Sequence, residues 1–237
     1  EAALKADLEQ IQQECRKEHW LFSINHPFLY IWKWLYGDLR LDGVHCLEII
    51  NDPTYEADPE AKAGEANQRA VALSDLLWAD GHRICAIGGS DSHNTLEERY
   101  PGATEPSVPG DPATFVYMED LSAEHLLEGV RSCNCYVTRH CRIETGLLFG
   151  GQLPEDKEEL PYRICLRGQK EKPEIFYLHN GKRVDCRVTG REDAWDGSLS
   201  TSPVIKTGCI MYWAESADFR DSMDPDRHRA AGLTQSG

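Results

Sequence analysis

The alternation of apolar and polar positions divides the chain into an α/β part and a β-rich part. In the first part, short apolar runs typical of buried strands alternate with segments whose apolar residues recur every three or four positions, as on one face of a helix. This order is typical of parallel strands joined by crossover helices. The expected strands lie at 21–24, 44–50, 83–88, 114–118 and 135–138, and the expected helices at 4–15, 67–78 and 122–130.

Local signals support the second and third helices. Gly81 follows the last apolar position of the second helix and is its expected C-terminal stop. Ser122 precedes the third helix, where its hydroxyl is an expected N-cap. We expect this third helix to bury Leu126, Leu127 and Val130.

The pattern changes from about residue 146. Short alternating segments at 162–166, 175–178, 183–188 and 208–213 are separated by Gly, Pro and Asn turns, without a helical stripe. The pair Asn180-Gly181 is a strong hairpin signal. We therefore expect an α/β domain at 1–145 and a small antiparallel β domain, of the sandwich type, at 146–237.

The first helix begins at the start of the chain. Its apolar face is formed by Leu4, Leu8, Ile11 and Cys15, and the sequence opens at Glu1 rather than at a methionine. A helix without a start signal suggests preceding polypeptide. We therefore expect the chain to be part of a longer protein.

Composition limits the classes of partner. The chain has 237 residues, of which 41% are hydrophobic, and 25 Lys and Arg stand against 40 Asp and Glu, a formal net charge of -15. This excess of acid argues against nucleic acid or an anionic membrane as the main partner. No apolar run approaches the roughly 20 residues that span a bilayer, and there is no signal-peptide pattern. The 9 cysteines include no C-x-x-C pair, so we expect a cytoplasmic protein with reduced thiols in its core.

Candidate chemistry follows the ends of the first three strands. His26 comes after the first strand, Glu48 lies late in the second with Asn51 just beyond it, and Asp91 and His93 come after the third. Parallel strands place their C-terminal ends on one edge of a sheet, where such folds bind ligands. Imidazole and carboxylate together are ligands for zinc, manganese or iron.

Each residue alone has a simpler explanation. His26 precedes Pro27, which cannot donate to a sheet ladder, so it can merely end the strand. Asp91 can cap the loop that follows it, and Glu48 can be a solvated strand residue. Their joint occurrence at one edge favours the metal interpretation. His140 follows another expected strand and is a further candidate.

Three segments in this order carry a family resemblance. They are Asn25-His26-Pro27-Phe28, Leu47-Glu48-Ile49-Ile50-Asn51 and Gly88-Gly89-Ser90-Asp91-Ser92-His93. Together they resemble the later part of a PHP (polymerase and histidinol phosphatase) domain, and most closely its CehA/McbA-like branch of metal-dependent hydrolases. The Ser-Asp-Ser-His loop is the most specific of the three.

The resemblance implies a fold and an activity. The expected fold is the later part of a distorted (β/α)7 barrel, whose C-terminal mouth in the intact family holds two or three divalent ions (Zn, Mn or Fe). His26 and His93 would be metal ligands, Asp91 a ligand or catalytic proton-handling residue, and Glu48 and Asn51 would lie near the site. The expected reaction is hydrolysis of a small-molecule phosphate ester, or of an ester or carbamate, by a metal-activated water.

One motif of the family is missing. No His-x-His pair occurs anywhere in the chain, so an active enzyme would need the first half of the barrel upstream or from a second chain in an oligomer. The alternative is a catalytically inactive PHP-like scaffold or a ligand-binding or interaction module. A carbohydrate-binding β domain is a further alternative, based on Trp195, Tyr212 and Trp213.

Overall fold

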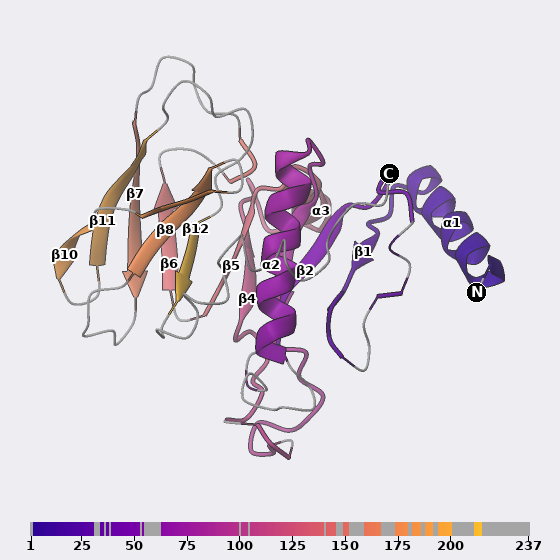
Figure 1. Ribbon diagram of the computed structural model, residues 1–237, viewed down its shortest axis with the longest axis horizontal. Helices are drawn as coiled ribbons and strands as arrows, with labels where there is room; N and C mark the ends of the chain where they lie inside the picture. Colours follow the sequence, from indigo (N-terminus) through magenta and orange to yellow (C-terminus); the bar gives the residue numbers. More distant parts are fainter. Residues whose placement is uncertain are drawn as a thin grey trace. The chain divides into compact units, whose positions relative to one another are not determined.

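Two units make up the chain in its computed structural model (Figure 1). The first comprises Glu1–Leu77 and His82–Arg139, and the second Trp78–Gly81 and His140–Gly237. The residues that the structure describes are 2–30, 34–35, 37, 39–52, 54, 63–99, 101–103, 105–139, 141–145, 149–151, 159–166, 174–179, 182–185, 188–191, 194–200 and 211–214.

A three-stranded parallel sheet lies in the first unit. Its strands are β1 (Ser23–Ile24), β2 (Cys46–Asn51) and β3 (Cys85–Gly89), in the order β1-β2-β3. The central strand β2 is buried along almost its whole length, as expected for a parallel strand covered on both faces. The parallel direction that the sequence predicts for these strands is confirmed, so their C-terminal ends lie on one edge.

All three predicted helices form. They are α1 (Ala2–Lys17), α2 (Ala63–Ala79) and α3 (Ala123–Arg131). Gly81 ends α2 as predicted, with a positive φ of 94° and an N–H that donates to the Trp78 carbonyl at 3.0 Å. None of the described helices is both long and apolar enough to cross a membrane.

The inward face of α1 differs from the predicted one. Cys15 is buried, but Ile11 is 50% exposed. Gln12 is buried instead, because its Nε2 donates to the Arg40 carbonyl at 2.9 Å. A satisfied amide therefore takes the place that the pattern assigns to an apolar side chain.

The face of α3 also differs from the prediction, although its cap does not. The Ser122 hydroxyl accepts from the His125 N–H at 3.2 Å, which confirms the N-cap. Leu126 and Leu127 are 41% and 39% exposed, so the expectation that they are buried is wrong. The helix buries Gly129 instead, because it packs so tightly on β4 that a Cβ there would lie 2.5 Å from Val116 Cγ1.

The strands β4 (Ala113–Val116) and β5 (Cys135–Thr138) form a separate antiparallel pair. The expectation that parallel alternation continues to about residue 140 is therefore wrong. One cause is Thr114, whose Oγ1 accepts from the Gly88 N–H at 2.9 Å and donates to the Gly88 carbonyl at 2.8 Å. This side chain occupies backbone groups of β3 that a ladder would use. Within the described residues no (β/α)7 barrel forms.

The second unit contains two antiparallel sheets, with strand orders β10-β11-β7-β6 and β12-β8-β9. In the second of these sheets, β8 and β9 are antiparallel and pair His179 with Lys182, which confirms the hairpin predicted around the two intervening residues. The first strand, β6, joins this unit although it precedes residue 146. The sandwich and the carbohydrate-binding interpretation stay predictions. The strands are β6 (Cys141–Thr145), β7 (Glu159–Leu166), β8 (Glu174–His179), β9 (Lys182–Asp185), β10 (Val188–Arg191), β11 (Ala194–Ser200) and β12 (Met211–Ala214).

Buried thiols form part of the core of the first unit. Cys46 and Cys85 are register partners on β2 and β3, and Cys133 and Cys135 are also buried and free. The Cys85 thiol exchanges hydrogen bonds with the other three, which raises its pKa, so it stays protonated. The prediction of reduced cysteine in the core is confirmed for these four residues.

Gly88 and Gly89 offer a matched test of packing in β3. A Cβ at Gly88 would lie 2.7 Å from Val137 Cγ1 and 2.8 Å from the Ile50 carbonyl, whereas a Cβ at Gly89 meets nothing within 4 Å. We expect Gly88→Ala to lower the free energy of unfolding by about 1–3 kcal/mol through overpacking, and Gly89→Ala to leave it within about 0.5 kcal/mol. Urea unfolding checks both. Equal losses would contradict the packing described for β3.

Candidate functional site

Backbone strain marks the edge where the three parallel strands end. His26 follows β1, Asp52 follows β2 and Asp91 follows β3, and all three are non-glycine residues with positive φ, at 34°, 26° and 47°. Such conformations cost about 1–3 kcal/mol each and are concentrated at functional sites. We call this region the carboxyl edge, defined by His26, Glu48, Asn51, Asp91 and His93.

Glu48 is the buried acid of the carboxyl edge. It is 8% exposed, so the solvated alternative is wrong. Its Oε2 accepts from the His26 N–H at 2.7 Å, and Asn51 Nδ2 lies 3.3 Å from both carboxylate oxygens. Burial raises the pKa of Glu48 and the Asp91 carboxylate adds to this rise, while the hydrogen bonds from Asn51 and His26 oppose it. Glu48 therefore ties the end of β1 to β2.

Asp91 and His93 are brought together by the loop after β3. His93 Nε2 lies 3.0 Å from Asp91 Oδ1, a hydrogen-bonding distance, and the two side chains are 71% and 42% exposed. Zinc binds nitrogen and oxygen at about 2.0–2.2 Å, so two of its neighbouring ligand atoms lie about 3 Å or slightly more apart. The spacing of this pair therefore suits a shared ion as well as a shared proton.

A third ligand does not join this pair in the described part of the chain. Among those residues, no group of three or more His, Cys, Asp or Glu side chains is arranged to hold a metal ion. His26 lies close enough to Glu48 to affect its pKa, but the contact between them is made by the His26 backbone. His140 lies outside the described residues. The predicted residues thus lie on one edge, and the described part of the chain does not complete a metal site there.

Asn67 on α2 holds the end of β2. Its Oδ1 accepts from the Asn51 N–H, and its Nδ2 donates to the Asn51 carbonyl, both at 2.9 Å. One side-chain amide thereby satisfies both backbone groups of Asn51, where the regular ladder ends. No sequence pattern predicts this role, since an asparagine in the first turns of a helix has no strong signal of its own.

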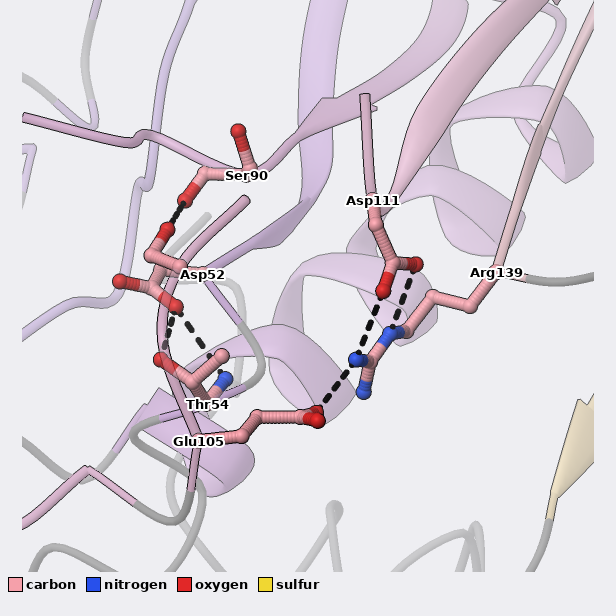
Figure 2. A network of polar contacts seen from close by, with 7 residues as sticks. Asp52, Thr54, Ser90, Glu105, Asp111 and Arg139 are labelled. Carbon is pink, nitrogen blue, oxygen red and sulfur yellow. Dashed lines mark hydrogen bonds and ion pairs between the residues drawn. The ribbon is translucent and has the colours of Figure 1, made fainter. Parts of the chain in front are cut away.

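The segment 105–111, further along the chain, contacts both neighbours of Asp91. Ser107, 2% exposed, donates from its hydroxyl to the Ser90 carbonyl at 2.7 Å. Its own carbonyl accepts from the Ser92 hydroxyl at 2.8 Å. Figure 2 labels Ser90 and Asp52 in the same network of polar contacts. Ser107 therefore fixes the chain immediately before and immediately after Asp91.

Arg139, which follows β5, binds both ends of the segment 105–111. Its Nε and Nη2 donate to the two carboxylate oxygens of Asp111, each at 3.0 Å, and Nη2 also donates to Glu105 at 2.5 Å (Figure 2). Hydrogen bonding to Asp111, and then to Glu105, raises the pKa of Arg139 despite burial. Arg139 and Ser107 cannot be found from local sequence patterns, because their partners lie many positions away in the chain.

Asp52 is a second buried acid beside the edge. It is 5% exposed, and one carboxylate oxygen accepts from both the Thr54 N–H, at 3.2 Å, and the Thr54 hydroxyl. Burial raises its pKa, and the hydrogen bonds from Thr54 oppose the rise. These contacts form the turn that the Asp-Pro pair suggests.

Comparison with models of known families, with curated proteins and with solved structures found no match. The interpretation of the carboxyl edge therefore depends on its own residues and geometry.

Asn67 provides a test of how the edge is held. We expect Asn67→Ala to lower the free energy of unfolding by about 1–3 kcal/mol, because it leaves two backbone groups of Asn51 without partners. Asn67→Asp retains the acceptor and loses the donor, so we expect an intermediate loss. Urea unfolding of the three proteins measures this order. An alanine variant as stable as the parent would show that the two hydrogen bonds from Asn67 to Asn51 do not stabilise the fold.

Asp75 on α2 makes stability depend on pH. It is 7% exposed, and burial raises its pKa from 3.8 to about 6. The folded state therefore binds its proton more tightly than the unfolded state does. This contribution to stability is fully present below about pH 4 and is lost as the pH rises to about 6.

We expect Asp75→Asn to match the parent near pH 4 and to be more stable by about 2–3 kcal/mol at pH 7, following the size of the pKa change. Asp7→Asn, at an exposed position on α1, is the control. Urea unfolding between pH 4 and 8 measures the difference. A gain that is the same at every pH would contradict the assignment to Asp75.

Proposed function

We propose that the chain is part of a PHP-type metal-dependent hydrolase, and that its carboxyl edge contributes Asp91, His93 and His26 to a site for Zn, Mn or Fe. The carrying observation is the 3.0 Å separation of Asp91 Oδ1 and His93 Nε2 on a strained loop. The proposed substrates are small molecules with a phosphate ester, or with an ester or carbamate bond. The imidazole and carboxylate donors are those such ions take.

The chemistry of the donors fits such an ion, but their number does not complete its site. The described residues lack a three-ligand group, and the sequence lacks the family's His-x-His pair. The proposed centre therefore takes further ligands from beyond the described residues, and no reaction step is assigned to the described residues alone. When bound, such an ion would act as a Lewis acid that activates water and neutralises charge on the substrate oxygen. Glu48 holds the His26 backbone at that edge by accepting its N–H.

A catalytically inactive scaffold is the second candidate. It is favoured by the same pairing, since Asp91 and His93 already satisfy each other through a hydrogen bond. In this alternative, the edge is a polar end of the sheet whose groups stabilise the loop after β3. The two candidates differ in whether a divalent ion displaces that hydrogen bond.

Metal titration of the full chain separates them. We expect isothermal titration calorimetry with Zn²⁺ and Mn²⁺ to detect a saturable site, and Asp91→Asn and His93→Gln each to weaken it by about tenfold or more, because metal affinity falls with each lost ligand. The chain offers a matched control in His125, which pairs with Asp120 at 2.8 Å on the surface. His125→Gln should leave binding unchanged.

The outcomes are distinct. Loss of binding in the edge variants alone supports the metal site. Equal losses in all three variants would indicate diffuse binding by an acidic surface. Absence of saturable binding in the parent would favour the scaffold.

A further inference from the structure

The segment 105–111 contacts the residues on both sides of Asp91, and Arg139 binds both of its ends. We call this segment the strap. We propose that Arg139 and Ser107 are positioning residues that act through the strap to hold Asp91 and His93 in their paired geometry. The ligand role of that pair depends on the proposed function, whereas the positioning itself is a property of this chain.

The first support is the backbone of Asp91. Its φ of 47° lies in the left-handed region, which is costly for a residue with a Cβ and persists only where the surroundings impose it. Ser107 supplies this constraint, since it bonds the Ser90 carbonyl at 2.7 Å and the Ser92 hydroxyl at 2.8 Å. The two contacts fix Asp91 from both sides. They leave its carboxylate free to meet His93.

The second support is the way Arg139 binds the strap. The guanidinium bonds the first residue, Glu105, and the last, Asp111, at 2.5–3.0 Å. Arg139 and Asp111 are partly buried, with exposed fractions of 26% and 23%, whereas the Glu105 side chain is 47% exposed. A planar guanidinium can bridge two carboxylates with fixed directions, which a lysine cannot do. Arg139 thereby holds together the two ends of the segment that contains Ser107.

The third support is electrostatic. The carboxylates of Glu105 and Asp111 meet at one nitrogen, Arg139 Nη2, at 2.5 and 3.0 Å, in a chain of net charge -15. Without Arg139, Glu105 and Asp111 would repel each other at the two ends of the strap. Arg139 converts this repulsion into a doubly bonded ion pair, so its removal should release the strap rather than only weaken it.

The test compares Arg139→Met, Arg139→Lys and Ser107→Ala with the full-length parent, by NMR and without added metal. The control is Arg142→Met, which breaks an exposed pair of Arg142 with Glu144 at 3.3 Å. Two signals report on the loop: the backbone order parameters of residues 90–93, and the nitrogen shift of His93 Nε2, which senses its hydrogen bond to Asp91. Urea unfolding is measured in parallel.

We expect order parameters near 0.85 in the parent to fall below about 0.6 in Arg139→Met and Ser107→Ala, with the His93 Nε2 shift moving toward that of a free ring. Arg139→Lys should be intermediate, and Arg142→Met should match the parent. If Arg139 and Ser107 only stabilised the fold, their variants would lower the free energy of unfolding and leave both local signals unchanged. That result would overturn the proposal. So would an equal response to Arg142→Met.

Calorimetry with Mn²⁺ on the same variants keeps the two proposals separate. If the parent binds Mn²⁺, Arg139→Met should weaken binding by about tenfold, as for residues that orient metal ligands. Unchanged binding in that variant would overturn the positioning of the ligands. If the parent binds no Mn²⁺, the metal function fails, and the NMR signals still decide whether the strap positions the pair.

Discussion

The structure depends most on the need to pair polar groups where the parallel sheet ends. At this point the backbone ladder of β2 runs out while the surroundings are still buried, so each N–H, carbonyl and carboxylate needs a new partner. The Glu48 carboxylate accepts from the His26 N–H. The Asn67 side chain accepts from the Asn51 N–H and donates to the Asn51 carbonyl. The Ser107 hydroxyl donates to the Ser90 carbonyl. Side chains thus replace strand pairing at the same edge where the candidate ligands lie.

The same contacts explain how strained residues persist there. Three successive strand ends adopt left-handed backbone conformations, and each has a side chain or neighbour that is held by hydrogen bonds from another segment. Hydrogen bonds from other segments thus hold the backbone at all three strand ends. The pairing of Asp91 with His93 is compatible both with a metal centre that needs more ligands and with a purely structural loop, because an ion and a proton require nearly the same spacing.

The sequence predicts the local features of this architecture and misses the distant ones. Strand and helix positions follow from periodicity, and the gathering of His26, Glu48 and Asp91 on one edge follows from the parallel order of three strands. The exposure of Leu126 does not follow, because it depends on how closely α3 approaches β4. Arg139 and Asp111 are 28 positions apart, and no local pattern links a single arginine to a particular aspartate.

Thr114 has a consequence for how the sheet ends. Its hydroxyl bonds both backbone groups of Gly88, so at that position a side chain makes the contacts that a neighbouring strand would otherwise make. On the opposite flank the sheet ends in β1, a strand of only two residues. Among the described residues, the two flanks of this sheet therefore end differently, one at a side chain that imitates a strand and the other at a very short strand.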